Sequence, residues 1–176
     1  MSRAIARFAA TLVLCAALAP ARAAGDWERF FVPFLGDLRA EASDAGKTGL
    51  KGLVLMFHFD DCPACARMKR EVLSRPEVQR YFRGRFAAVA IDTRGAVEVT
   101  GFDGHTLPEN VFARALGIRA TPTFMFYAPD GSLLTTHLGA IYDPAEFILL
   151  GEYVASGAYR GASFAAFRQS KHKRGS

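Results

Sequence analysis

Cysteine is scarce in this chain, and its scarcity limits the chemistry that the sequence can support. Among 176 residues only Cys15, Cys62 and Cys65 occur, which is too few for a disulfide framework. Zinc normally takes four ligands, and the chain has neither a second C-x-x-C nor an H-x-x-x-H spacing. A structural zinc site is therefore not expected.

Long apolar runs are also lacking, as are internal repeats and low-complexity tracts. The apolar core of the N-terminus, residues 11–18, is too short to cross a bilayer comfortably, and no later run is longer. Repeat architectures and membrane-spanning helices are thus not predicted.

The N-terminus instead has the three parts of a signal peptide. Arg3 and Arg7 precede the apolar core, and residues 21–23 (Ala-Arg-Ala) give the small-x-small pattern of a cleavage site. We expect residues 1–23 to be removed on export to the periplasm, taking Cys15 with them. The alternative is an amphipathic helix that stays attached.

Positive charge is concentrated in segments that do not form a patterned face. The formal net charge is +5, and removal of the three arginines of residues 1–23 lowers it to +2. The remaining excess lies in the last residues, so nucleic acid is not an expected partner. We predict one domain over residues 24–160, a flexible basic tail over residues 161–176 and a monomeric protein.

Hydrophobic patterning predicts an α/β fold with a mixed central sheet flanked by helices. An extra amphipathic helix is expected over residues 27–44, with Pro33 either kinking it or marking its first turn. Residues 97–107 are expected to form a hairpin-like insertion that turns at Asp103-Gly104. The other expected strands cover residues 53–59, 86–91, 124–127 and 133–138, and the other expected helices start near residues 62, 74, 109 and 143.

Cys62 and Cys65 form a C-P-A-C motif at the predicted start of a helix. Without another cysteine to pair with in the mature chain, they indicate a redox pair. The helix N-terminus directs backbone N–H groups at Cys62 and favours its thiolate, so Cys62 is the expected nucleophile. Cys65, one turn deeper, is expected to attack the mixed disulfide and release the product.

Two aspartates come just before the motif. Asp60 and Asp61 end the preceding strand and are suited to cap the helix. Their negative charge opposes the helix dipole, so the thiolate is expected to be stabilised moderately rather than extremely. A moderate effect favours a reductase over a strong oxidant.

These motifs carry a family resemblance. A strand ending in C-P-x-C at a helix start, Ala-Thr-Pro-Thr at residues 120–123 and a Pro-Asp-Gly turn at residues 129–131 resemble the thioredoxin fold. The stretch LVLMFHFDDCPAC, the FDG segment at residues 102–104 and ALGIRATPTF are similar to periplasmic thioredoxin-related proteins of the SoxW type. The resemblance covers residues 27–154.

The resemblance implies a function and further site residues. It implies that Pro122 is cis, lies beside the C-x-x-C motif and presents the Thr121 backbone to a substrate segment. It also implies a reductase of protein disulfides that is recharged by a membrane-embedded electron donor and that needs no cofactor. Client proteins of sulfur oxidation or cytochrome c maturation are implied in the same way.

One departure from thioredoxins concerns proton transfer. Where thioredoxins carry a buried Asp and a Lys on neighbouring strands, this sequence has Met56 and Ala88. His58, at the end of the same strand, is the nearest titratable replacement as proton acceptor for Cys65.

Two other function classes stay open at this level. One is an oxidase or isomerase on the same fold. The other is a carrier that binds copper or another soft metal through Cys62 and Cys65.

Overall fold

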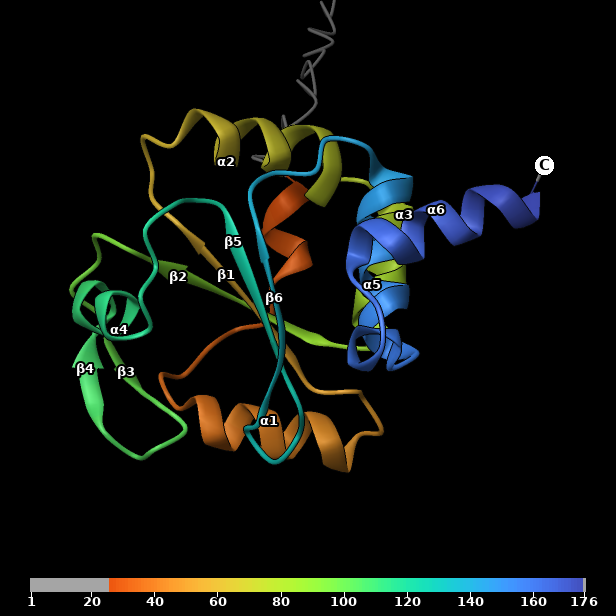
Figure 1. Cartoon of the computed structure of the whole chain (residues 1–176). Coiled ribbons are helices and arrows are strands. Elements are labelled where there is room, and N and C mark those ends of the chain that lie inside the picture. Colours follow the sequence, from red (N-terminus) through yellow and green to blue (C-terminus); the bar gives the residue numbers. More distant parts are fainter. Residues whose placement is uncertain (1–25, 176) are drawn as a thin grey trace, which may run out of the picture.

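A mixed four-stranded sheet forms the centre of the molecule. The structure is a computed structural model, and it describes residues 26–175 (Figure 1). The strands lie in the order β2-β1-β5-β6. Their bounds are β1 Leu53–His58, β2 Ala87–Asp92, β5 Thr123–Tyr127 and β6 Leu133–Leu138.

Strand β1 is central because it is apolar on both faces. All six of its residues are buried. It pairs in parallel with β2, with Leu53 opposite Ala87, and antiparallel with β5, with Leu53 opposite Tyr127. Burial on both faces matches a continuous apolar run in a partly parallel sheet. The predicted α/β fold with a mixed sheet is confirmed.

Helices cover the two faces of the sheet and define two hydrophobic clusters. One cluster, built around stacked phenylalanines such as Phe82 and Phe147, includes both cysteines of the motif. The other lies on the opposite face and includes α1 and α4. The helices are α1 Leu38–Lys47, α2 Pro63–Met68, α3 Pro76–Arg83, α4 Glu109–Ala115, α5 Pro144–Ala155 and α6 Phe164–Gly175. Shorter helical segments are η1 Asp26–Phe30, η2 Lys69–Leu73 and η3 Ala158–Arg160.

The predicted hairpin insertion is present as a separate two-stranded sheet. Strands β3 Glu98–Thr100 and β4 Thr106–Pro108 pair antiparallel, and the turn between them contains Gly104 at φ +86°. The Arg39 guanidinium of α1 donates hydrogen bonds to the Phe102 carbonyl in this turn. The hairpin is thereby attached to α1.

The expected continuous helix over residues 27–44 is wrong. The structure has η1, an extended segment and then α1, because Pro33 and Gly36 (φ +95°) interrupt the helical backbone. Asp37 caps the new start, and its carboxylate accepts from the Arg39 and Ala40 amides at 2.9 Å each.

The C-terminal residues also differ from the expected flexible tail. Residues 164–175 form α6, which packs Phe164 and Phe167 against Tyr153 of α5 with ring centroids 5.6 and 5.5 Å apart. Lys171 pairs with Glu152 at 2.9 Å. The helix extends beyond the body of the domain in Figure 1. The predicted signal peptide lies outside the described residues, and the boundaries at 24 and 160 stay predictions.

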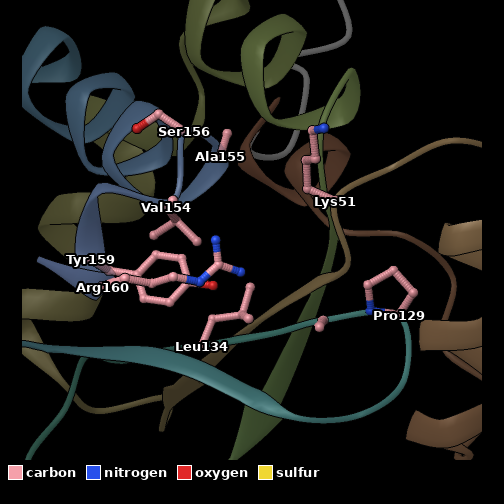
Figure 2. A pocket seen from close by; sticks show the side chains of 10 residues that line it. Lys51, Pro129, Leu134, Val154, Ala155, Ser156, Tyr159 and Arg160 are labelled. Carbon is pink, nitrogen blue, oxygen red and sulfur yellow. The ribbon is translucent and has the colours of Figure 1, made fainter.

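A hollow of about 320 Å³ lies at one end of α5. Tyr159, Arg160 and Leu134 are among the residues around it (Figure 2). None of the residues that line it belongs to the C-P-A-C motif or to the loop of Thr121. Across residues 26–175, no helix has the length and apolar character that a membrane span requires.

Candidate active site

Cys62 and Cys65 form a disulfide at the start of α2. Their Cα atoms are 5.2 Å apart, within the usual range for a bridged pair. Cys62 is the N-cap residue, and its Sγ accepts a hydrogen bond from the Cys65 amide at 3.1 Å. Pro63 at the first helical position needs no partner for a backbone N–H. The predicted placement of Cys62 at a helix start is confirmed.

The helix is capped by this sulfur and not by the preceding aspartates. Asp60 and Asp61 lie in the turn between β1 and α2 and are both exposed. The expectation that they cap α2 is therefore wrong, because the N-cap position falls one residue later, at Cys62.

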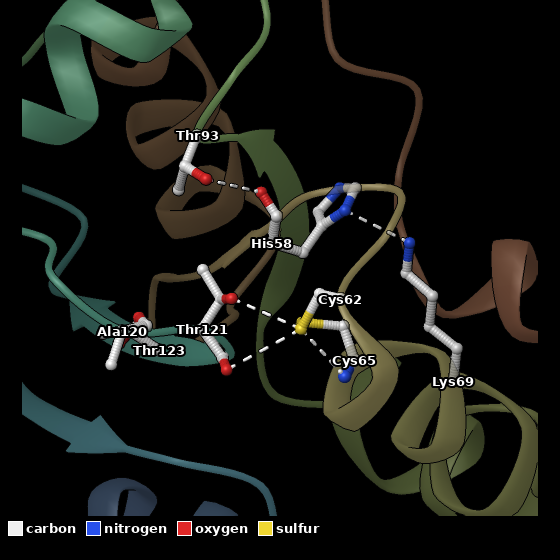
Figure 3. The surroundings of a disulfide bond; sticks show 8 residues. All are labelled: His58, Cys62, Cys65, Lys69, Thr93, Ala120, Thr121 and Thr123. Carbon is white, nitrogen blue, oxygen red and sulfur yellow. Dashed lines mark hydrogen bonds between the residues drawn. A yellow bond between two sulfur atoms is a disulfide. The ribbon is translucent and has the colours of Figure 1, made fainter.

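Thr121 lies against the same sulfur. Its hydroxyl donates to Cys62 Sγ at 3.3 Å, and its carbonyl oxygen is 3.7 Å from that sulfur (Figure 3). The Thr121-Pro122 peptide bond is cis, as the resemblance implied. Two donors, the Cys65 amide and the Thr121 hydroxyl, thus point at Cys62 Sγ and stabilise negative charge on it once the disulfide is reduced.

The surroundings of Cys65 are apolar. Cys65 is 1 % exposed and belongs to the same cluster as Met56 and Ala88, the two positions where thioredoxins carry a charged pair. Among the described residues the buried polar side chains are His58, Gln79 and Thr123, and none of them is a carboxylate. The cluster thus contains no buried acid to accept a proton from Cys65.

His58 is directed at Lys69 and not at the sulfurs. The His58 side chain is buried, and its Nδ1 is 3.2 Å from Lys69 Nζ, as Figure 3 shows. Burial lowers the pKa of His58, the Lys69 charge lowers it further, and Asp92 and Asp60 act in the opposite direction. Burial likewise lowers the pKa of Lys69. A neutral His58 that accepts a hydrogen bond from Lys69 at Nδ1 carries its proton on Nε2. The Nδ1 lone pair is therefore engaged by Lys69 and does not face Cys65 as a proton acceptor.

Sequence reasoning missed Lys69 and the residues around it. Lys69 Nζ lies 4.2 Å from the centre of the Trp27 ring, and both line a hollow of about 280 Å³ beside Phe59. Trp27 comes from η1, far away in sequence. Lys69 follows Cys65 by four residues, a spacing that places both on one face of a helix. This spacing does not indicate which side chains Lys69 contacts.

A second hollow is lined in part by Thr121, the residue that contacts the Cys62 sulfur. It has a volume of about 330 Å³ and is lined by Phe59, Thr93, Arg94, Ile118, Arg119, Ala120 and Thr121. We call it the Thr121 hollow. Sequence reasoning identified Thr121 but neither arginine, since they belong to two loops that only the fold brings together.

The hairpin insertion does not flank the sulfurs. Phe102 in its turn packs on Tyr127 with ring centroids 4.4 Å apart, at the end of β5 opposite Thr123. Figure 1 shows β3 and β4 toward α1, whereas α2 lies at the other end of the sheet. The hairpin is thus placed away from the disulfide.

The arrangement allows thiol-disulfide exchange and offers few metal ligands. Within the described part of the chain, no three His, Cys, Asp or Glu side chains come together as a metal-binding group. A metal carrier would therefore depend on Cys62 and Cys65 as its protein ligands there. The redox pair, the cis proline and the mixed sheet together define a thioredoxin-fold protein with a C-x-x-C disulfide.

Comparisons with known proteins agree with this class. A family model described as a thioredoxin-like domain matches residues 38–155, so the chain belongs to the thioredoxin-like domain family. A thioredoxin from Thermus thermophilus is 25% identical with a TM-score of 0.52, over 70% of this chain and 88% of that one. A search of curated proteins gave no match.

Two further solved structures share the fold at lower identity. A thioredoxin-fold protein from Helicobacter pylori is 18% identical with a TM-score of 0.59, over 69% of this chain and 84% of that one. The DsbH oxidoreductase is 16% identical with a TM-score of 0.51, over 72% and 87% of the two chains.

Proposed function

We propose that this protein is a periplasmic thiol-disulfide oxidoreductase that reduces disulfides on partner proteins. The observation that carries the proposal is the pair of donors on Cys62 Sγ, the Cys65 amide at 3.1 Å and the Thr121 hydroxyl at 3.3 Å. The nucleophile of disulfide exchange is a thiolate, and these donors stabilise that form. Export rests on the signal-peptide pattern of residues 1–23.

The reaction follows in two steps. The Cys62 thiolate attacks one sulfur of the partner disulfide, a mixed disulfide forms, and the other partner sulfur leaves as a thiolate. Cys65 then loses its proton and attacks Cys62 Sγ, which re-forms the Cys62–Cys65 disulfide and releases the second partner thiolate. Two electrons pass to the partner, and an electron donor must restore the dithiol. A membrane-embedded donor, which the resemblance to SoxW-type proteins implies, is part of this proposal.

Free backbone groups beside Cys62 support docking of a substrate segment. The amides of Arg119, Ala120 and Thr121 have no hydrogen-bond partner among residues 26–175. An extended partner segment can pair with them as an added strand, next to the sulfur that it must reach.

Trapping tests the exchange role. We expect Cys65→Ala to accumulate mixed disulfides with partner proteins from a periplasmic extract, because the resolving thiol is gone while Cys62 still attacks. Cys62→Ala is the matched control and should trap none. The complexes are separated on non-reducing gels and should disappear on reduction. An absence of trapped protein with Cys65→Ala would contradict exchange with proteins.

The direction of electron flow is tested by the reduction potential. A reductase is expected to lie near thioredoxin's value of about −270 mV, whereas a value near the DsbA figure of about −120 mV would indicate an oxidase. Equilibration with glutathione buffers of known potential measures this quantity.

A further inference from the structure

The Thr121 hollow is the best placed surface to select partners of the proposed exchange reaction. Cys62 is only 3 % exposed, so a partner that reaches its sulfur must also contact the side chains immediately around it. Thr121 belongs both to the hollow and to the contacts of Cys62 Sγ. Figure 3 shows Thr93, Ala120 and Thr121 on one side of the disulfide, with Lys69 on the other.

The hollow carries positive charge and no carboxylate. Its two charged lining residues are Arg94 and Arg119. Asp61 lies 3.9 Å from Arg94, but its side chain is 91% exposed, so this pair is weak. The Asp92 carboxylate accepts from the backbone amide of Arg94 at 2.8 Å and not from its guanidinium. Arg119 has no ion-pair partner in the described part of the chain.

Both arginines are held on anchored loops. Thr93 donates to the His58 carbonyl through its amide at 2.7 Å and its hydroxyl at 3.1 Å, which fixes the loop of Arg94 to the end of β1. The Arg94 guanidinium stacks on the Phe59 ring, 3.8 Å from its centre. The Thr123 hydroxyl donates to the Ala120 carbonyl at 2.7 Å and fixes the loop of Arg119.

From this arrangement we infer that the Thr121 hollow binds a partner segment that carries Asp or Glu beside its reactive cysteine. A volume of about 330 Å³ accommodates one or two side chains of that size. A carboxylate there meets two cations, and it replaces the exposed Asp61 on Arg94. Selection by charge acts mostly on the encounter rate and is weakened by salt. This inference rests on the proposed exchange function and names the chemistry of its partners.

The test uses matched peptides with a neutral leaving group. Three peptides of equal length each carry one cysteine as a 2-pyridyl disulfide, flanked by Glu, Gln or Lys. When Cys62 attacks the peptide sulfur, 2-thiopyridone is released and its absorbance gives the second-order rate constant. The reduced full chain is expected to react roughly five times faster with the Glu peptide than with the Lys peptide at low salt. Near 1 M salt the ratio should approach one.

Two double variants separate the hollow from the overall charge. Arg94→Gln with Arg119→Gln should bring the Glu-to-Lys ratio close to one. Lys51→Gln with Arg80→Gln removes the same charge from residues outside the hollow and should keep the ratio. Circular dichroism verifies that both variants fold.

The outcomes distinguish the two levels of the proposal. Equal rates for all three peptides, a preference for the Lys peptide, or a Glu preference lost equally in both double variants would overturn the acidic partner and leave exchange intact. Failure of every peptide to release 2-thiopyridone would overturn the exchange function, and the partner inference with it.

Discussion

Thr121 affects the reactivity of the site through one hydroxyl. Its Oγ1 is 3.3 Å from Cys62 Sγ, and the carbonyl of the same residue is 3.7 Å away. The hydroxyl is a donor that the thiolate can use and that a methyl group cannot replace.

Thr121→Val should therefore slow the reaction of reduced Cys62 with a thiol reagent. One lost hydrogen bond corresponds to a decrease of roughly 3- to 10-fold near neutral pH. Thr121→Ser keeps the hydroxyl and should retain most of the rate. The measurement is the alkylation rate of the reduced protein over a range of pH. If the Val and Ser variants react equally fast, the hydroxyl does not stabilise the thiolate.

For single residues, the sequence predicted which residues form the site better than it predicted what they contact. Cys62 and Cys65 follow from their spacing, and their disulfide is present. The cis bond before Pro122 was implied only by the family resemblance, since the residues themselves do not specify the isomer. The Lys69 contact of His58 depends on how η2 lies against the end of β1 in the folded chain, which the local sequence pattern does not indicate.

At the scale of elements, the start of β1 depends on a close approach between backbones. Gly52 precedes β1 with φ +135°, and a Cβ there would overlap the Tyr127 carbonyl oxygen. Gly49, three residues earlier, also has positive φ at +82° but has nothing within 4 Å of its Cβ position. Substitution of Gly49 therefore introduces backbone strain alone, whereas substitution of Gly52 introduces both strain and a steric overlap.

Gly52→Ala is expected to lower the free energy of unfolding by about 3 kcal/mol or more, because β5 must move away from β1. Gly49→Ala should lower it by about 1 to 2 kcal/mol, the penalty for a left-handed alanine. Urea unfolding of both variants measures the difference. Equal losses would show that the approach of Tyr127 to Gly52 is relaxed easily.

The sequence predicted strands more reliably than the N-terminal and C-terminal helices. The apolar run of β1 and the Asp103-Gly104 turn carry strong local signals, and both elements formed as expected. The interruption between η1 and α1 was not predicted because apolar residues continue at helical spacing past Pro33 and Gly36. Helix α6 was not predicted because most of its residues are polar. Its two phenylalanines, Phe164 and Phe167, pack on Tyr153 of α5, a contact that the sequence does not indicate.

For the whole molecule, two histidines link stability to pH, of which His58 is buried and His137 is half-buried. Burial lowers the pKa of His58 and of His137; Lys69 adds to the effect at His58, and Glu146 opposes it at His137. The unfolded chain therefore binds protons at these positions below about pH 6.5, while the folded chain does not. Stability is fully present above that pH and falls as the pH drops toward the lower folded values.

We expect the free energy of unfolding to decrease between pH 7 and pH 5. Burial raises the pKa of Glu41 and Glu109, which acts in the opposite direction at the acidic end. A variant with His58→Gln and His137→Gln should lose most of the decrease, as measured by urea unfolding at each pH. An unchanged slope in this variant would assign the dependence to other groups.

The two edges of the four-stranded sheet, β2 and β6, differ in how far they are covered. On the outer side of β2, the Val32 amide donates to the Ala88 carbonyl at 2.9 Å, so the segment before α1 covers part of that edge. Strand β6 is the other edge, with Leu138 71% exposed. Polymerisation by strand addition needs two open edges on every copy, whereas a single open edge can be used only once. Strand pairing between copies of this protein through the four-stranded sheet is thus favoured at β6, and pairing of two β6 edges leaves only the partly covered β2 edges of that sheet.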